Sequence, residues 1–309
     1  MSVAAPAPSL VVVNIGRLVT CDPGLPAPGV IEDAVLAAEG QRIVHAGPAA
    51  GWDLRSGPLT LEIDAGGAAV IPGFVDAHTH LAWLGDRADE YALRAAGASY
   101  EEVAAAGGGI RSTVAATAAG SLEELTGATR ERARRMLRFG TTTLEIKSGY
   151  GQAQSAELRQ LQAALALTAE PGVPDIVTTY LPLHGPVDGD RAAYLERVLD
   201  EGLPAAAPLV GYVDCFCEKG AWSVEECERL LLAGRDHGLR AKVHAEQRSR
   251  YGGAALAARH GAVSADHLEH ADDSDLRALA TAGVTGVLLP GASLVLGGPP
   301  PPGRRLLEA

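Results

Sequence analysis

The chain has 309 residues, of which 47% are hydrophobic and 21% charged, so it is long enough to bury a large core. Its formal net charge of −12 argues against a nucleic acid or an anionic membrane surface as a partner. The N-terminus lacks a basic stretch followed by a long apolar core, and no apolar run approaches the roughly 18 residues that span a bilayer. We therefore expect a cytoplasmic protein.

Four cysteines, at positions 21, 215, 217 and 227, are too few and too scattered for a disulfide framework. Cys215 and Cys217 alternate along a predicted strand, which puts both sulfur atoms on one face of it. This spacing favours packing over metal binding.

The first 68 residues consist of short strand-like segments broken by Gly, Pro and Asp. The segments lie at residues 10–20, 34–47 and 59–64. They predict a small β-sandwich-like domain over residues 1–68.

From residue 69 onward, predicted strands alternate with predicted helices, a pattern typical of a parallel sheet. One helix is expected at 121–139, where Ser121 and Glu124 have the spacing of a capping box, and another at 156–169. The predicted strands are 69–76, 141–147, 175–183, 212–217, 240–244, 262–266 and 284–289. We interpret residues 69–309 as strands one to seven of a (β/α)8 TIM-type barrel, which has eight.

Two histidines follow the first of these strands, in the run Asp76-Ala77-His78-Thr79-His80. Alternate residues of a strand point the same way, so His78 and His80 can share one metal ion. Polar residues recur at the C-terminal ends of the later strands, where barrel enzymes build their sites. These residues lie at 147–151, 183–184, 217–220, 244–247 and 265–270. The recurrence favours a metal site over a set of structural histidines.

The sequence resembles the imidazolonepropionase family of the amidohydrolase superfamily over nearly its whole length. His78, His80, His244 and His267 carry the superfamily pattern. The narrower likeness lies in segments 86–91, 98–102, 106–113, 145–151 and 244–247. The resemblance implies hydrolysis of a ring C–N bond in 4-imidazolone-5-propanoate, which gives N-formimidoyl-L-glutamate in histidine degradation.

The resemblance also implies a role for individual residues. His78, His80 and His244 match the ligands of a single zinc or iron ion, which would activate water for attack on the ring carbonyl. His267 and His184 are candidates for stabilising the oxyanion that follows. The positions that match substrate contacts are Arg87, Tyr100, Tyr150, His184 and Gln247.

Arg87 fits this role chemically, because a guanidinium group pairs with a propionate through two hydrogen bonds. The alternative interpretation of Arg87 is a solvated arginine in the charged run 86–90.

The family resemblance further implies a homodimer as a possible assembly.

The sequence departs from the family at the end of strand eight. The family has a metal-binding Asp there, in an Ala-Thr-Asp-x-Asn-Pro-Gly segment, and this sequence has no such segment. Asp266 does not replace it, because strand alternation beside His267 would point it the other way. Residues 304–309 look like the helix before strand eight, so we expect a C-terminally truncated fragment.

Two other functions stay open at this point. One is a different cyclic amidase or deaminase of the superfamily, and the other is a catalytically dead remnant that lacks the strand-eight Asp.

Three further motifs receive structural interpretations. Lys147 is expected to form an ion pair with Glu145 or a neighbouring strand, rather than to carry a metal-bridging carbamate. Gly107 to Gly109 are expected to form a flexible active-site loop, since they do not follow a strand and lack the ending of a phosphate loop. The Pro-rich residues 297–303 predict an extended loop.

Overall fold

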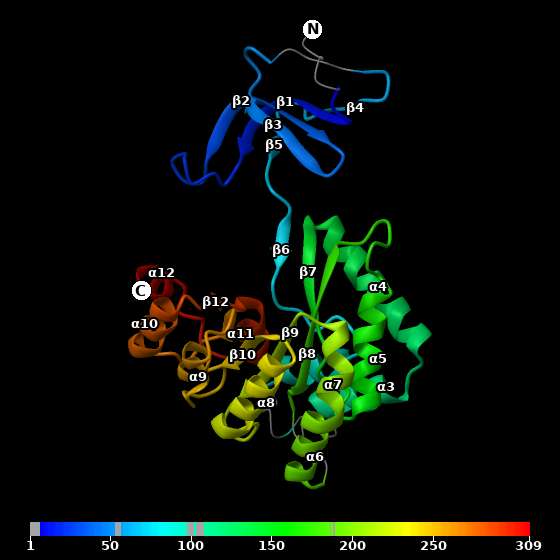
Figure 1. Ribbon diagram of the computed structural model, residues 1–309, viewed down its shortest axis with the longest axis vertical. Coiled ribbons are helices and arrows are strands. Elements are labelled where there is room, and N and C mark those ends of the chain that lie inside the picture. The colour runs from blue at the N-terminus through cyan, green and yellow to red at the C-terminus, as the bar shows by residue number, and fades with distance from the viewer. Residues whose placement is uncertain (1–6, 53–56, 98–101, 103–107, 186, 188) are drawn as a thin grey trace. The chain divides into compact units, whose positions relative to one another are not determined.

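The structure is a computed structural model that describes residues 7–52, 57–97, 102, 108–185, 187 and 189–309 (Figure 1). The chain divides into two compact units, Met1–Gly73 and Phe74–Ala309. None of the described helices is long and apolar enough to cross a membrane.

The N-terminal unit is a single mixed sheet with strand order β3-β2-β1-β4, in which β5 also pairs with β1. Strand β2 is antiparallel to both β1 and β3, whereas β4 and β5 run parallel to β1. Small apolar clusters centred on Val11 and Ile15 form its core. The strands are β1 (Leu10–Val19), β2 (Val30–Glu39), β3 (Arg42–Pro48), β4 (Leu61–Asp64) and β5 (Ala69–Val70).

The single strand predicted over 69–76 is two strands in the structure. Ala69–Val70 forms β5 in the N-terminal sheet, and Phe74–Asp76 forms β6 in the second unit. Pro72 and Gly73 separate them, because proline has no N–H to donate to a ladder.

The second unit is built on a parallel sheet of seven strands, in the order β12-β11-β10-β9-β8-β7-β6. Three of its strands coincide with the predicted ranges, and the other predicted strands differ at their ends. The bounds are β6 (Phe74–Asp76), β7 (Thr141–Lys147), β8 (Asp175–Leu183), β9 (Tyr212–Cys217), β10 (Arg240–Ala245), β11 (Ser264–His267) and β12 (Thr285–Val287).

Helices connect these strands, and Figure 1 shows them on the outside of the sheet. Helices α4 and α5 pack on β7 and β8, while α8 and α9 pack on β9 and β10. The helical elements are α1 (Ala88–Ala95), α3 (Ile110–Ala119), α4 (Leu122–Arg138), α5 (Gln154–Leu165), α6 (Arg191–Arg197), the π-helix η1 (Val198–Gly202), α7 (Leu203–Ala206), the 3-10 helix η2 (Ala207–Leu209), α8 (Val224–Asp236), α9 (Gly253–Arg259), α10 (Asp273–Ala282), α11 (Pro290–Leu296) and α12 (Gly303–Glu308).

The capping box predicted at Ser121 and Glu124 is present at the start of α4. Ser223 with Glu226 and Asp272 with Asp275 form the same motif at α8 and α10. Each box satisfies backbone N–H groups that a helix start leaves without partners. Helices α4, α8 and α10 therefore begin at defined residues.

The sheet curls so that its first and later strands face each other across an interior. Lys242 on β10 donates to the carbonyl oxygen of Ala77, directly after β6, at 3.0 Å. His78 lies 2.6 Å from Asp266 on β11. These contacts join strands that are four and five places apart in the sheet, so the sheet must curve as in a barrel. This curvature agrees with the predicted TIM-type barrel.

Glycine at position 234 allows α8 to approach β9 closely. A Cβ atom there would lie 2.5 Å from Cγ1 of Val213, well inside van der Waals contact. We predict that G234A lowers the free energy of unfolding by about 1–3 kcal/mol, because the core must shift to admit the methyl group. Urea denaturation followed by circular dichroism measures this change.

The matched control is G127A inside α4, where an added Cβ meets no atom within 4 Å. This substitution should raise the free energy of unfolding by about 0.5–1 kcal/mol, since alanine favours a helix over glycine. Equal stability of the two variants would contradict the close packing of α8 on β9.

Candidate metal centre and active site

The three histidines that the sequence singled out as ligands come together at the C-terminal end of the curled sheet. His78 and His80 follow β6, and His244 lies on β10. One ring nitrogen from each of them lies within 4.8 Å of the others. The Nε2 atoms of His80 and His244 are 3.4 Å apart, which places their lone pairs around one small volume.

Two buried aspartates lie behind this cluster. Asp266 Oδ2 is 2.6 Å from Nδ1 of His78, and Asp214 Oδ2 is 3.1 Å from Nδ1 of His244. Asp266 is hydrogen-bonded to the ring of His78, and Asp214 lies at ion-pair distance from that of His244. A carboxylate on the Nδ1 side leaves Nε2 free to bind a metal, as is usual for ligand histidines.

The prediction that Asp266 points away from the site was wrong. Asp266 and His267 are consecutive, yet both reach the cluster: the ring centroid of His267 is 5.3 Å from that of His78. His267 has a φ of 84°, and Leu268 has a φ of 68°. This backbone leaves the strand conformation, so the alternation of side chains ends at Asp266.

The environment keeps the histidines neutral, as a metal ligand must be. Burial lowers the pKa of His78, and it lowers the pKa values of His80 and His244 further. His80 Nδ1 is buried and accepts or donates no hydrogen bond within the described part of the chain. The neutral imidazoles, their converging nitrogens and the two carboxylates fit a divalent metal ion.

Lys147 forms the ion pair that the sequence predicted. Its Nζ lies 2.8 Å from Glu145 Oε2, 2.8 Å from Asp214 Oδ2 and 3.4 Å from Asp266 Oδ2. These three carboxylates raise its pKa above the usual value despite complete burial. A protonated amine cannot carry a carbamate, so this geometry favours the ionic interpretation.

A pocket of about 600 Å³ opens beside the histidines and contains several of the predicted substrate residues. Its wall includes Arg87, Tyr150, His184, Gln247, Glu269 and Ser293. Tyr100, the remaining predicted substrate residue, lies outside the described residues.

Arg87 forms an ion pair with Glu90 on the next helical turn, with Nε donating to Oε2 at 2.8 Å. Glu90 Oε2 also accepts from the backbone N–H of Gly109 at 2.7 Å. The pair therefore ties the guanidinium group to the start of α3, at the described end of the glycine-rich segment.

The loop that carries Tyr150 is held by a buried carboxylate that the sequence reasoning missed. Glu157 on α5 accepts backbone hydrogen bonds from Gly149, Gly151 and Gln152 at 2.7–2.9 Å. This binds the loop after β7 in one conformation. Nδ1 of His184 in turn donates to the carbonyl oxygen of Gly149 at 3.0 Å.

Buried carboxylates also bind backbone N–H groups of the loops that follow β9 and β10. Glu218 accepts from the backbone N–H groups of Lys219, Arg248 and Ser249 at 2.8–3.2 Å. Glu246 accepts from those of Tyr251, Gly252 and Ala254 at 2.5–3.1 Å. Buried carboxylates thus organise the loops that line the pocket.

His267 faces the carboxylate of Glu269, which the sequence reasoning also missed. Glu269 Oε1 accepts from the hydroxyl group of Ser293 at 2.6 Å and lies 3.7 Å from His267 Nδ1. His267 and Leu268 hold positive φ values that cost non-glycine residues about 1–3 kcal/mol each. This strain is concentrated in the segment that turns His267 toward the histidine cluster.

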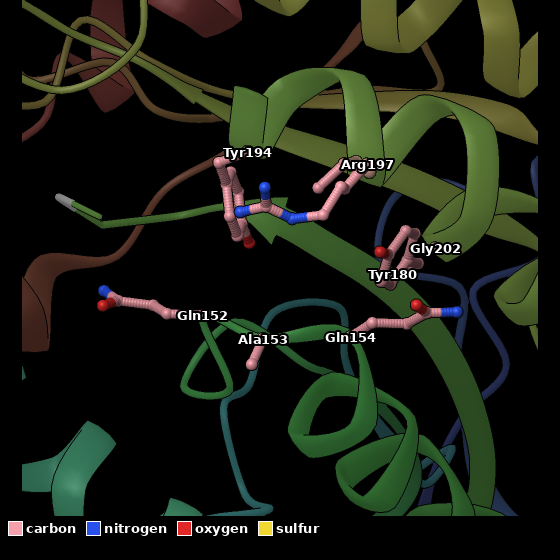
Figure 2. A pocket seen from close by; sticks show the side chains of 8 residues that line it. Gln152, Ala153, Gln154, Tyr180, Tyr194, Arg197 and Gly202 are labelled. Carbon is pink, nitrogen blue, oxygen red and sulfur yellow. The ribbon is translucent and has the colours of Figure 1, made fainter. Parts of the chain in front are cut away.

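A second cavity of about 140 Å³ lies apart from the histidine cluster. Figure 2 shows Tyr194 and Arg197 on one side of it and the residues at the start of α5 on the other. Its wall contains none of the histidines, so we assign the chemistry to the larger pocket.

Solved structures with similar folds support the barrel architecture. An adenosine deaminase from Xanthomonas campestris with bound zinc aligns with a TM-score of 0.67 and 19% identity, covering 98% of this chain and 68% of that one. A zinc complex of atrazine chlorohydrolase from Arthrobacter aurescens TC1 aligns with a TM-score of 0.61 and 19% identity, covering 97% of this chain and 69% of that one. At these identities the similarity establishes the fold alone.

The sequence comparisons are more specific. An amidohydrolase family model matches residues 61–108. The imidazolonepropionase of Hyphomonas neptunium is 48% identical over 294 residues, covering 93% of this chain and 72% of the relative. That of Rubrobacter xylanophilus is 46% identical over 301 residues, covering 96% and 70%. The chain thus spans about 70% of each of these two relatives. It belongs to the imidazolonepropionase family of amidohydrolases.

Proposed function

We propose that this chain opens the ring of 4-imidazolone-5-propanoate by metal-dependent hydrolysis, with His78, His80 and His244 as the protein ligands of the ion. The observation that carries the proposal is the convergence of these three neutral imidazoles beside a pocket that contains Arg87 and Tyr150. A small-molecule substrate with one carboxylate suits a pocket of this size and charge.

Zinc is the first metal to test. Imidazole nitrogen binds both zinc and iron well, and the similar folds solved with a metal contain zinc. When bound, the ion supplies an acidified water molecule and polarises the ring carbonyl group. Three histidines leave a coordination position open for that purpose.

Arg87 and Tyr150 provide the groups that would hold the substrate. The guanidinium group of Arg87 attracts the propionate, and Glu90 fixes its orientation. Gln247 offers an amide that can both donate and accept hydrogen bonds at the ring. Tyr100 stays a prediction from the family resemblance.

His184 is better suited to accept a ring N–H than to stabilise an oxyanion. Burial lowers its pKa to about 4, so it is neutral at pH 7. Its Nδ1 proton is donated to Gly149, which leaves Nε2 as an acceptor only. This tautomer argues against the oxyanion role that the sequence left open for His184.

His267 is the candidate for moving the proton. Glu269 lies on the Nδ1 side of the ring and favours a proton there, which leaves Nε2 to accept one from the attacking water. The resulting imidazolium can return that proton to the ring nitrogen as the C–N bond breaks. Water thereby supplies the new carboxylate oxygen, and the departing nitrogen gains the proton.

Turnover of 4-imidazolone-5-propanoate by the zinc-loaded chain tests the proposed function. We expect formation of N-formimidoyl-L-glutamate that stops on chelation and returns with added metal. The double variant H80N/H244N should be inactive, because it removes two of the three ligands. Preferential turnover of a hydantoin or of cytosine would favour another amidase or deaminase, and stoichiometric metal without turnover would favour a pocket that only binds.

R87M should raise KM for the propanoate substrate about 10- to 100-fold, which corresponds to loss of a charge-assisted hydrogen bond of about 1.5–3 kcal/mol. Steady-state kinetics on the same imidazolone ring without its propionate provides the control. Wild type and R87M should handle that truncated substrate alike. A loss of activity that is equal for both substrates would place Arg87 outside substrate binding.

The metal-free protein should lose stability as the pH falls from about 6.5 toward 4. The pKa of His184 is near its ordinary value of 6.5 in the unfolded chain, and burial lowers it to about 4 in the folded chain. Between pH 6.5 and 4 the unfolded state therefore binds more protons than the folded state. The free energy of unfolding decreases as the pH is lowered through this range. Urea titrations at several pH values measure it.

H184N is the control for this titration, because asparagine carries no proton in either state. Its free energy of unfolding should fall less steeply over the same window. Parallel curves for the wild type and H184N would contradict the assigned pKa of His184.

A further inference from the structure

Lys147 is the least exposed cation of the site and contacts carboxylates from three different strands. Its side chain has no exposed surface, and neither do those of Asp214 and Asp266. Glu145 lies on β7 with Lys147, Asp214 on β9 and Asp266 on β11. The ammonium group therefore sits where these strands converge behind the histidines.

Each of two carboxylates bound by Lys147 also faces one proposed ligand. Asp214 Oδ2 lies 2.8 Å from Lys147 Nζ and 3.1 Å from His244 Nδ1. Asp266 Oδ2 lies 3.4 Å from Lys147 Nζ and 2.6 Å from His78 Nδ1. The same oxygen atom makes both contacts in each aspartate, so a shift of the lysine displaces the partner of a histidine.

We propose that Lys147 is a positioning residue for the metal centre, which fixes the rings of His78 and His244 together through Asp266 and Asp214. This inference rests on the proposed metal site. The lysine balances two buried negative charges that would otherwise repel each other, and their contact with one ammonium group holds the two carboxylates close together. Lys147 thereby links two ligands from opposite sides of the barrel.

Lys242 offers a matched control. It is also a buried lysine, and it contacts Glu145 Oε1 at 2.7 Å and the carbonyl oxygen of Ala77 at 3.0 Å. K242M therefore removes a buried ammonium group and an ion pair with the same glutamate, but leaves the contacts of Lys147 with the two aspartates.

The test compares K147M with K242M in two measurements. Zinc affinity is measured by competition with a chromophoric chelator. The tautomers of the histidines are measured in the metal-free protein by ¹⁵N NMR, with H78N and H244N spectra for assignment. We expect K147M to weaken zinc binding about 10- to 100-fold and to change the ¹⁵N shifts of His78 and His244. K242M should change neither.

The double variant K147M/E145Q covers the case in which K147M does not fold, because it removes one positive and one negative charge while keeping both aspartates. E145Q alone is its reference. Zinc affinity and ¹⁵N shifts equal to those of the reference would overturn the inference. If wild type itself binds no zinc, the proposed metal site fails, and the ¹⁵N comparison still decides whether Lys147 sets the histidine tautomers.

Discussion

The second unit depends on one constraint, the burial of Lys147 among Glu145, Asp214 and Asp266. Each buried ion loses several kcal/mol of hydration, which is offset only when its partners lie at hydrogen-bonding distance. The carboxylates come from β7, β9 and β11, so the register and curvature of these strands must satisfy all the contacts at once. Charge compensation in the interior thus fixes the positions from which the proposed metal ligands project.

The outer part of the site follows a related rule. Glu157, Glu218 and Glu246 each bind several backbone N–H groups of a loop that follows a strand. A loop that leaves a strand end has N–H groups without sheet or helix partners, and a buried carboxylate satisfies several of them together. Such loops can present Tyr150, Gln247 and Arg248 without regular secondary structure.

The repeating strand and helix pattern was sufficient to predict the barrel architecture and three strand ranges without error, because burial on both faces makes such strands apolar and continuous. The interruption at Pro72 and Gly73 shows where this reasoning failed, since an apolar run contains no information about which sheet a strand joins. Pro72 is the local signal for the break between β5 and β6.

The candidate site could be predicted only in part. The convergence of His78, His80 and His244 was predictable from their places at strand ends, because histidines are few and chemically distinct. Their role as ligands came from the family resemblance and stays a proposal. Asp214 had a local signal, a charged residue inside the apolar strand Tyr212–Cys217. Asp266 was misplaced because its orientation was inferred from that of His267. Asp266 lies opposite His244 in the strand register, and it is His267 whose positive φ, which the sequence alone does not specify, ends the alternation.

The three proposed ligands differ in what holds them, and this difference has a physical consequence. His78 and His244 each have a carboxylate at Nδ1, whereas His80 is held by packing, with its ring stacked on His184 at 4.6 Å and an interplanar angle of 12°. Stacking restrains the plane of a ring through contact and not through a directed hydrogen bond. The orientation of His80 therefore depends on His184, and through it on Gly149 and the loop that Glu157 binds. The loop after β7 that carries Tyr150 is thus linked to the proposed ligand His80 through His184, by contacts that do not include Lys147, Asp214 or Asp266.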